Sequence, residues 1–216
     1  MAQIFPKWTN KAPLYVVVGL VLLVNIVAGL INYYASPLNI DVGYRPNQPV
    51  PYSHKVHAGD LGVDCRFCHT GVETSPVAGI PPTKTCMQCH NIIKASSDSL
   101  KLVKESLRYK KPLQWVRVHK SPDYVYFDHS AHLTAGVGCA SCHGNIADME
   151  VVYQAESLSM GWCLDCHRNP DDHLRPASEL TNMTWTPPAN QAEFALKQKA
   201  LLDIKAPITD CTGCHR

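Results

Sequence analysis

The most apolar part of the chain lies near its N-terminus. Residues 14–31 read LYVVVGLVLLVNIVAGLI, a run with no charged side chain and a single asparagine as its only strongly polar residue. A run of this length can span the hydrocarbon core of a bilayer as a helix. Trp8 and Tyr15 before or at its start, and Tyr33 and Tyr34 after its end, stand where interfacial aromatic residues are expected. The pattern predicts a transmembrane helix.

The charges around this helix predict its orientation. Lys7 and Lys11 precede the run, and no basic residue follows it until Arg45. The positive-inside tendency then puts the N-terminus in the cytoplasm and everything after about residue 35 on the periplasmic or extracytoplasmic side of the cell inner membrane. A cleaved signal peptide is the alternative, but the run is long for a signal core and residues 33–35 (YYA) make a poor cleavage site. We expect an uncleaved single-pass anchor in contact with membrane lipid.

Beyond the anchor, apolar positions are sparse and their spacing is helical. Residues 97–109 place Leu100, Val103 and Leu107 at helical intervals, with Ser97 as the expected N-cap. A second helix is expected over residues 192–202. Proline and glycine cluster in residues 45–51 and 75–82, which predicts irregular chain there.

The arrangement of the cysteines indicates a specific cofactor chemistry. All ten fall into five Cys-x-x-Cys pairs, and a histidine follows each pair directly. The motifs are Cys65-Arg66-Phe67-Cys68-His69, Cys86-Met87-Gln88-Cys89-His90, Cys139-Ala140-Ser141-Cys142-His143, Cys163-Leu164-Asp165-Cys166-His167 and Cys211-Thr212-Gly213-Cys214-His215.

This spacing suits covalent attachment of haem c. Two thiols two residues apart add to the two vinyl groups of one porphyrin, and the next residue presents an imidazole to the iron. Zinc sites also use Cys-x-x-Cys pairs, but they do not require a histidine after every pair. A disulfide framework leaves the five histidines unexplained. The motifs predict five covalently bound haem c groups, with the five motif histidines as proximal iron ligands.

An internal repeat supplies candidates for the second axial ligands. Residues 52–69 read YSHKVHAGDLGVDCRFCH and residues 127–143 read FDHSAHLTAGVGCASCH, and a second haem motif follows each. The offsets between corresponding elements are 75 residues for the first histidine, 74 for the first cysteine and 77 for the second motif. The chain is therefore expected to contain a duplicated two-haem module, with the fifth motif as a C-terminal addition.

Six histidines lie outside the motifs: His54, His57, His119, His129, His132 and His173. Four of them form two His-x-x-His pairs, and the two histidines of each pair are three residues apart. On a helical turn both imidazoles of a pair therefore project to roughly the same side. If these pairs serve four haems, the fifth has a choice among His119, His173 and Met160 as distal ligand. Spacing does not decide which ligand meets which iron.

These features together predict the fold class: mostly α and coil, with a single N-terminal transmembrane helix, a multihaem cytochrome c domain with a haem-built core, and little sheet. The expected segments are a cytoplasmic N-terminus and anchor (1–35), a linker (36–51), a first two-haem module (52–96), a linking helix and connector (97–118), a second two-haem module (119–175) and a C-terminal segment with the fifth haem (176–216). The formal charge of +2 carries no nucleic-acid inference, because five haems would add about ten propionate carboxylates. No nucleic-acid partner is expected.

Closely spaced haems favour electron transfer over substrate conversion. A multihaem enzyme needs an open iron site, whereas here at least six distal candidates compete for five irons, so no catalytic residue is assigned. A third reading makes the chain a quinol dehydrogenase by itself. Its single helix, with one asparagine and no carboxylate, offers little of a proton-handling quinone site.

The chain closely resembles the pentahaem cytochrome subunit of alternative complex III. The more specific parts of the match are residues 115–119 (WVRVH), residues 122–129 (PDYVYFDH) and residues 160–168 (MGWCLDCHR). The resemblance implies a relay subunit of a quinol:electron-acceptor oxidoreductase, with a polytopic quinol-oxidising subunit that oxidises menaquinol and an iron-sulfur subunit as partners. It also implies a monohaem cytochrome, a copper protein or an oxidase as acceptor, and it supports His119 and Met160 as distal ligands. The multihaem subunit of menaquinone reductase complexes is the nearest competing family, and electrons would then flow in the reverse direction.

Overall fold

The structure is a computed structural model that describes residues 4–36 and 39–215. Residues 1–3, 37–38 and 216 lie outside the described residues, so the outermost parts of the expected segments 1–35 and 176–216 and a part of the linker 36–51 fall there. The chain divides into two compact units, one that ends at Ile40 and one that begins at Asp41.

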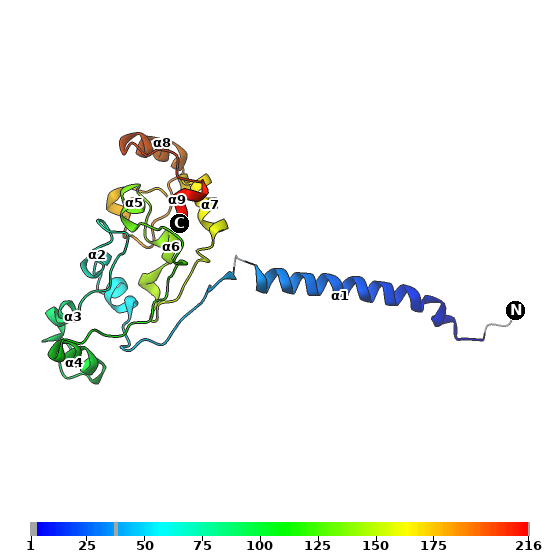
Figure 1. Cartoon of the computed structure of the whole chain (residues 1–216), viewed down its shortest axis with the longest axis horizontal. Helices are drawn as coiled ribbons and strands as arrows, with labels where there is room; N and C mark the ends of the chain where they lie inside the picture. Colours follow the sequence, from blue (N-terminus) through cyan, green and yellow to red (C-terminus); the bar gives the residue numbers. More distant parts are fainter. Residues whose placement is uncertain (1–3, 37–38, 216) are drawn as a thin grey trace. The chain divides into compact units, whose positions relative to one another are not determined.

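The first unit contains one long helix. A 3-10 turn, η1 (Lys7–Lys11), leads into α1 (Ala12–Ala35), the blue helix of Figure 1, and a proline in its first turn suits a helix start. The large apolar side chains of residues 14–31 are 44–64% exposed around the whole circumference. The Asn25 amide donates to the Val21 carbonyl (2.8 Å), so the helix satisfies its own polar side chain. The helix prediction is confirmed, and residues 7–35 are long and apolar enough to cross a membrane.

The second unit consists of short helices joined by irregular chain. They are α2 (Cys65–Cys68), α3 (Thr83–His90), α4 (Lys101–Tyr109), α5 (His129–Thr134), α6 (Ala140–His143), α7 (Met160–Arg168), α8 (Gln191–Leu201) and α9 (Cys211–Cys214), with short turns η3 (Lys55–Asp60), η4 (Asp98–Leu100), η5 (Ile146–Asp148), η6 (Asp171–His173) and η7 (Ala177–Glu179). Within residues 4–36 and 39–215 there is no strand, only two isolated antiparallel bridges, Val125 with His215 and Val137 with Leu174. The predicted fold class, mostly helix and coil, is confirmed.

The two further helices expected from the apolar spacing are both present. The first is split, because η4 precedes α4, and Ser97 caps η4 with an extended backbone but without a side-chain hydrogen bond. The second, α8, begins one residue earlier than expected. In Figure 1, α3 and α4 lie together at one end of the second unit, while α7, α8 and α9 gather at the other.

Among residues 41–215, two small apolar clusters of buried side chains lie in the interior of this unit. One is formed by Val50, Met87, Leu100 and Val103, and the other by Val72, Leu133 and Leu180. Clusters of this size cannot balance the conformational entropy of about 170 ordered residues, which costs on the order of 1 kcal/mol or more per residue. The expectation that cofactors complete the core agrees with this distribution.

Candidate functional site

Each Cys-x-x-Cys pair sits on a single helical turn. The cysteine pairs of the first and fifth motifs form α2 and α9, and those of the second and fourth lie within α3 and α7. In the third motif Cys139 caps α6 and Cys142 lies within it. Cysteines three residues apart therefore lie on the same side of the turn. Three of these helices are capped by the side chain just before them or at the start of the turn: Asp64 accepts from Arg66 N, Ser159 from Trp162 N, and Asp210 from Gly213 N. A cap satisfies backbone donors that a one-turn helix leaves unpaired. Local sequence thus fixes the geometry of these thiol pairs.

The motifs adjoin one another in an order that differs from their order in the sequence. The Cys139 thiol donates a hydrogen bond to the Cys65 sulfur, which lowers the pKa of Cys65 and raises that of Cys139. Charge effects on thiol pKa values mark the other neighbours: Cys86 raises the pKa of Cys68, Cys166 and Cys163 raise that of Cys142, and Cys214 raises that of Cys163. Burial is the largest cause in those three thiols. The hydrogen bond and these charge effects link the motifs in the order second, first, third, fourth and fifth.

All eleven histidines lie in the described part of the chain, and six of them share one hydrogen-bond pattern. In each, Nδ1 bonds a backbone carbonyl at 2.6–2.9 Å: His57 with Ser53, His69 with Gly79, His90 with Ile93, His129 with Pro76, His132 with Asp128, and His167 with Ile208. Because a carbonyl only accepts, Nδ1 carries the proton and Nε2 keeps its lone pair. A carbonyl that fixes the tautomer in this way is the usual outer partner of a metal-binding imidazole. The donor set fits axial ligation of haem iron.

Three pairs of imidazoles have the separation that two axial ligands of one iron require. With each nitrogen about 2 Å from iron, the ring centroids stand roughly 6 Å apart. The centroid distance is 6.0 Å for His57 with His90, and 6.1 Å for His132 with His167. His129 and His143 are 6.3 Å apart with planes 6° from parallel. His119 also contacts His143, at 4.4 Å, which is too short for an iron between them.

The two His-x-x-His turns have the same aromatic support. Tyr52 meets His54 edge-on at 4.8 Å and stacks on His57 at 4.4 Å. Phe127 likewise meets His129 edge-on and stacks on His132, both at 4.8 Å. The local folds nevertheless differ, because His57 lies in the π-helical turn η3 and His129 and His132 lie in the α-helix α5. In each copy, both histidine rings contact the same aromatic ring, so they lie close together as the repeat predicted.

Burial keeps several of these imidazoles neutral. It lowers the pKa of His54 to about 4 and that of His143 to about 3, with neighbouring histidines as the smaller cause. Burial likewise lowers the pKa of His119 and His132. Nδ1 of His54 and Nε2 of His119 are buried without a hydrogen-bond partner. Neutral buried imidazoles with an unpartnered nitrogen are suited to a metal and poorly suited to solvent.

The remaining candidates are not brought to an imidazole partner. Met160 begins α7 with 61% of its surface exposed. His173 ends η6, and in the described residues it makes no ring contact. The ring of His215 lies beside that of Tyr124, with centroids 5.7 Å apart, and its backbone bridges Val125. The closest link of Met160 to the fifth motif is indirect, since Cys163 follows it by three residues and neighbours Cys214.

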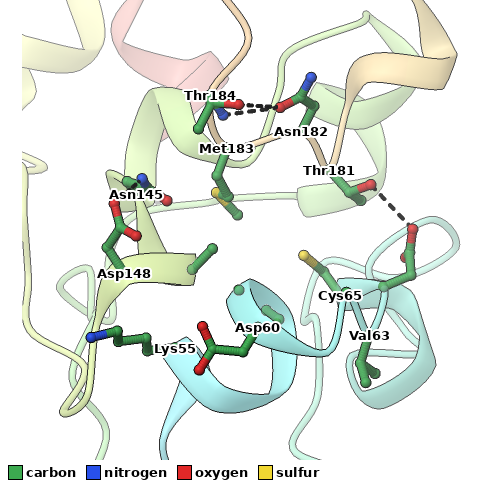
Figure 2. A pocket seen from close by; sticks show the side chains of 15 residues that line it. Lys55, Asp60, Val63, Cys65, Asn145, Asp148, Thr181, Asn182, Met183 and Thr184 are labelled. Atoms are coloured by element: carbon green, nitrogen blue, oxygen red, sulfur yellow. Dashed lines mark hydrogen bonds between the residues drawn. The ribbon is translucent and has the colours of Figure 1, made fainter.

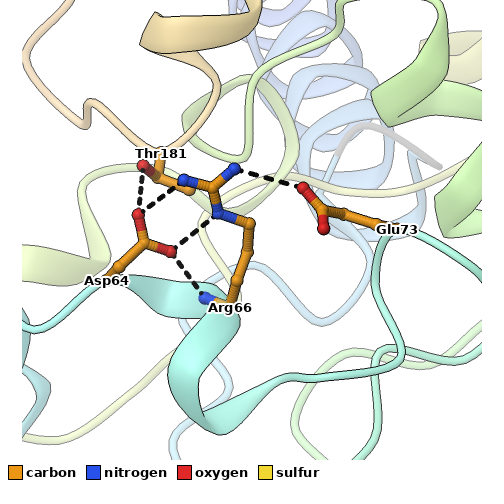
Figure 3. A network of polar contacts seen from close by, with 4 residues as sticks. All are labelled: Asp64, Arg66, Glu73 and Thr181. Atoms are coloured by element: carbon orange, nitrogen blue, oxygen red, sulfur yellow. Dashed lines mark hydrogen bonds and ion pairs between the residues drawn. The ribbon is translucent and has the colours of Figure 1, made fainter.

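Polar side chains surround the first motif. Arg66 binds both carboxylate oxygens of Asp64, each at 2.9 Å, and reaches Glu73 at 3.1 Å, while the Thr181 hydroxyl donates to Asp64 (Figure 3). The hydrogen bond from Arg66 lowers the pKa of Asp64 to about 2. A cavity of about 460 Å³ adjoins this motif, and Cys65 and Met183 are among its lining residues. Figure 2 shows its lining from close by. The network ties the first motif to the segment around residue 181.

Sequence reasoning missed three residues of this region. The Asp before Cys65, Asp64, and the Asp before Cys211, Asp210, carry a readable signal, because Asp favours the position before a helix. Arg175, described below, carries no such signal, since its role depends on burial by residues distant in the chain.

The chain is similar to known proteins along nearly the whole second unit. Residues 125–216 match the family of cytochrome c7 and related cytochrome c, and residues 35–122 match the class III cytochrome c family. A curated relative is the multihaem cytochrome c subunit of menaquinone reductase from Nitratidesulfovibrio vulgaris. The two sequences are 30% identical over 151 residues, which covers 60% of this chain and 71% of the relative.

Proposed function

Because this chain belongs to the multihaem c-type cytochromes, which bind haem covalently and transfer electrons, we propose that it carries five haems and relays electrons within a membrane complex. The observation that carries the proposal is the set of imidazole pairs at the separation of two axial iron ligands, His57 with His90 and His132 with His167, beside motifs whose thiols influence one another from the second motif to the fifth. Each haem supplies one-electron exchange between ferric and ferrous iron.

Ten cysteines and five histidines would hold these haems. The covalent attachment sites are Cys65, Cys68, Cys86, Cys89, Cys139, Cys142, Cys163, Cys166, Cys211 and Cys214, and the proximal ligands are His69, His90, His143, His167 and His215. The Nδ1 hydrogen bonds of His69, His90 and His167 support this role, because they leave Nε2 free to bind iron.

For the distal ligands, ring separations support two assignments in particular. His57 would bind opposite His90, and His132 opposite His167. In both modules the second histidine of the pair thus serves the module's own second motif. His54, His119 and His129 are the candidates for the irons of His69 and His143, and the 6.3 Å separation favours His129 for His143.

The fifth iron would take a ligand of another kind. Met160 is our proposal for the iron of His215, because Cys163 one turn later neighbours Cys214 of the fifth motif. His173 and His119 are the alternatives. A thioether in place of an imidazole raises the reduction potential of a haem.

We further propose that α1 anchors the chain in the cell inner membrane with the N-terminus in the cytoplasm and the haem domain on the periplasmic or extracytoplasmic side. Length, hydropathy and the lysines before the helix support this topology. Covalent haem c attachment on the exported side is consistent with it.

Two assemblies would use such a relay. In an alternative complex III, a polytopic quinol-oxidising subunit and an iron-sulfur subunit would supply electrons, and a monohaem cytochrome, a copper protein or an oxidase would receive them. In a menaquinone reductase, electrons would run towards the quinone, and the relative from N. vulgaris favours this second assembly. The chain needs no substrate site of its own in either case.

One set of measurements tests the proposal. Intact mass of the purified chain should show five added haems, and any smaller number removes the five-haem relay. Optical reduction by a menaquinol analogue should occur only with the co-purified partners, whereas rapid reduction of the isolated chain would make it a quinol dehydrogenase by itself. Reoxidation of the pre-reduced assembly by a menaquinone analogue would select the menaquinone reductase direction.

A further inference from the structure

Arg175 is a buried cation without a carboxylate partner. Its side chain is 5% exposed, and its guanidinium stacks over the Trp185 ring at 4.6 Å. Its NH1 group donates to the backbone carbonyls of Asn182 (2.9 Å) and Glu179 (3.4 Å), and Nε is buried without a partner. Among the residues the structure describes, Arg175 forms no ion pair.

The nearest carboxylate does not neutralise this charge. Glu179 accepts a hydrogen bond from the Asn182 amide at 2.7 Å and lies beyond ion-pair distance of Arg175. Burial lowers the pKa of Arg175, and the charges of Cys139 and, to a smaller extent, Glu179 act in the opposite direction. A guanidinium remains protonated at neutral pH under these conditions, so a net positive charge is held inside the protein.

A glycine makes room for this cation beside the third haem motif. A Cβ on Gly138 would stand 2.2 Å from Cζ of Arg175, and Gly138 directly precedes Cys139. Backbone contacts hold residues 136–137 against residues 174–175: Arg175 N donates to Gly136 O (2.9 Å), and Val137 bridges Leu174. The side chain also reaches Ser141 inside the motif, at 3.5 Å. The guanidinium is thus fixed against the turn that carries the third pair of thiols.

The position of the Arg175 guanidinium relative to the thiols decides whether its charge acts on the iron or is neutralised by haem propionates. Cysteines join a porphyrin at its vinyl edge, and the two propionates lie on the opposite edge, so a haem attached to the third motif would carry its propionates away from this charge. Reduction of ferric haem removes one positive charge from the iron. A fixed cation nearby therefore favours the ferrous form, and the low polarity of a buried site strengthens this effect.

We propose that Arg175 raises the reduction potential of the haem held by Cys139 and Cys142. The inference rests on the proposed function, because it needs a haem on the third motif. Since this motif is the middle one in the series of contacts, Arg175 would set how strongly the centre of the relay retains an electron.

The test is a spectroelectrochemical titration of the full-length protein in detergent. Arg175→Gln should lower the ratio of reduced to oxidised haem about tenfold for one of five components at a fixed ambient potential, which corresponds to about 59 mV. Arg175→Lys keeps the charge and should restore most of the potential. Arg108→Gln is the matched control, since Arg108 also stacks on an aromatic ring (Tyr109, 5.6 Å) but lies exposed on α4, and it should move no component.

Two results would overturn the proposal. One is an unchanged set of five potentials in Arg175→Gln with all haems retained, and the other is an equal decrease in the Gln and Lys variants, which would indicate packing on Trp185. If the Gln variant lacks haem, Gly138→Ala provides a second test in which Arg175 is still present. The new Cβ would displace the guanidinium, so the reduction potential of the same haem should fall. A haem count below five in the parent protein would contradict the proposed function instead.

Discussion

Phe127 stacks on His132 with ring centroids 4.8 Å apart and planes inclined by 27°, and Tyr52 stacks on His57 in the same way, at 4.4 Å and 21°. Both histidines also bond the carbonyl four residues earlier through Nδ1. Two restraints on one ring, a stack and a hydrogen bond, fix its orientation at little entropic cost. The repeat therefore preserves the support of the second histidine as well as the histidine itself, as the proposed role in iron binding requires.

Loss of the stack should loosen one distal ligand. Phe127→Leu removes the ring beside His132 and keeps the hydrogen bond, so we expect a fraction of one haem to become high-spin in EPR and absorption spectra. Tyr109→Leu, an exposed aromatic residue on α4, serves as the control and should leave the spectra unchanged. An all-low-spin Phe127→Leu protein would show that the hydrogen bond alone orients His132.

The proposed pairing of His132 with His167 can be tested by combining variants. His132→Ala should convert one haem to high spin, because the iron then lacks its sixth ligand. In a chain with Cys163→Ala and Cys166→Ala, which cannot attach the fourth haem, the same substitution should add no high-spin signal. A new high-spin haem in that background would assign His132 to another iron.

His129→Ala and Met160→Ala separate the imidazole sites from the proposed thioether site. The first should leave one haem high-spin, and an all-low-spin spectrum would remove His129 from the ligand set. The second should lower or abolish a single redox component while the other four remain, as measured by potentiometric titration. Five unchanged potentials after Met160→Ala would favour His173 or His119 as the ligand of that iron.

Acid should weaken the anchoring of the first motif. Because the pKa of Asp64 is about 2 in the folded protein and 3.8 for an ordinary aspartate, the contribution of its carboxylate is fully present above about pH 4 and is lost as the pH falls through 2. Both partners are about 40% exposed, so solvent screening limits the contribution to about 1 kcal/mol or less. Asp64→Asn should lower stability to urea at pH 7 and have no effect near pH 2. Asp123→Asn, at an exposed position, is the control, and an Asp64→Asn effect that persists at pH 2 would point to the helix cap instead.

Gly59→Ala should destabilise the contact between η3 and η5. A Cβ there would stand 2.4 Å from the Ala147 carbonyl oxygen, a backbone atom that cannot move by itself. We expect a loss of about 1–3 kcal/mol, measured as a lower midpoint of thermal unfolding of the haem-loaded protein. Gly161→Ala in α7 is matched to it, since nothing lies within 4 Å of that Cβ, and it should be neutral or slightly stabilising. Equal midpoints for the two variants would mean that η3 and η5 separate readily.

The sequence predicted the elements whose cause is local. The apolar run predicted α1, and the helical spacing of Leu100, Val103 and Leu107 predicted the helix that the structure splits into η4 and α4. The repeat predicted two corresponding histidine turns. The motif order was not predictable, because the contact between Cys65 and Cys139 joins residues 74 positions apart and depends on the whole unit. The π-helical form of η3 was missed for a similar reason, since Gly59 packs there against a distant segment.

Arg175 illustrates the same limit for a functional residue. Its sequence neighbours, Leu174 and Pro176, give no sign that the guanidinium is buried or unpaired. Only the fold places Gly138 beside it and directs Glu179 towards Asn182. Side chains whose effect is electrostatic and long-range therefore need coordinates, whereas covalent attachment sites do not.

The contact between Cys65 and Cys139 has a further consequence, because these two residues occupy the same position in the two copies of the repeat. A surface that meets its own copy through equivalent residues is isologous, which is the kind of contact that two-fold homodimers make. A contact of this kind places the first and third motifs back to back, so a change at either cysteine would act on both copies of the repeat at once.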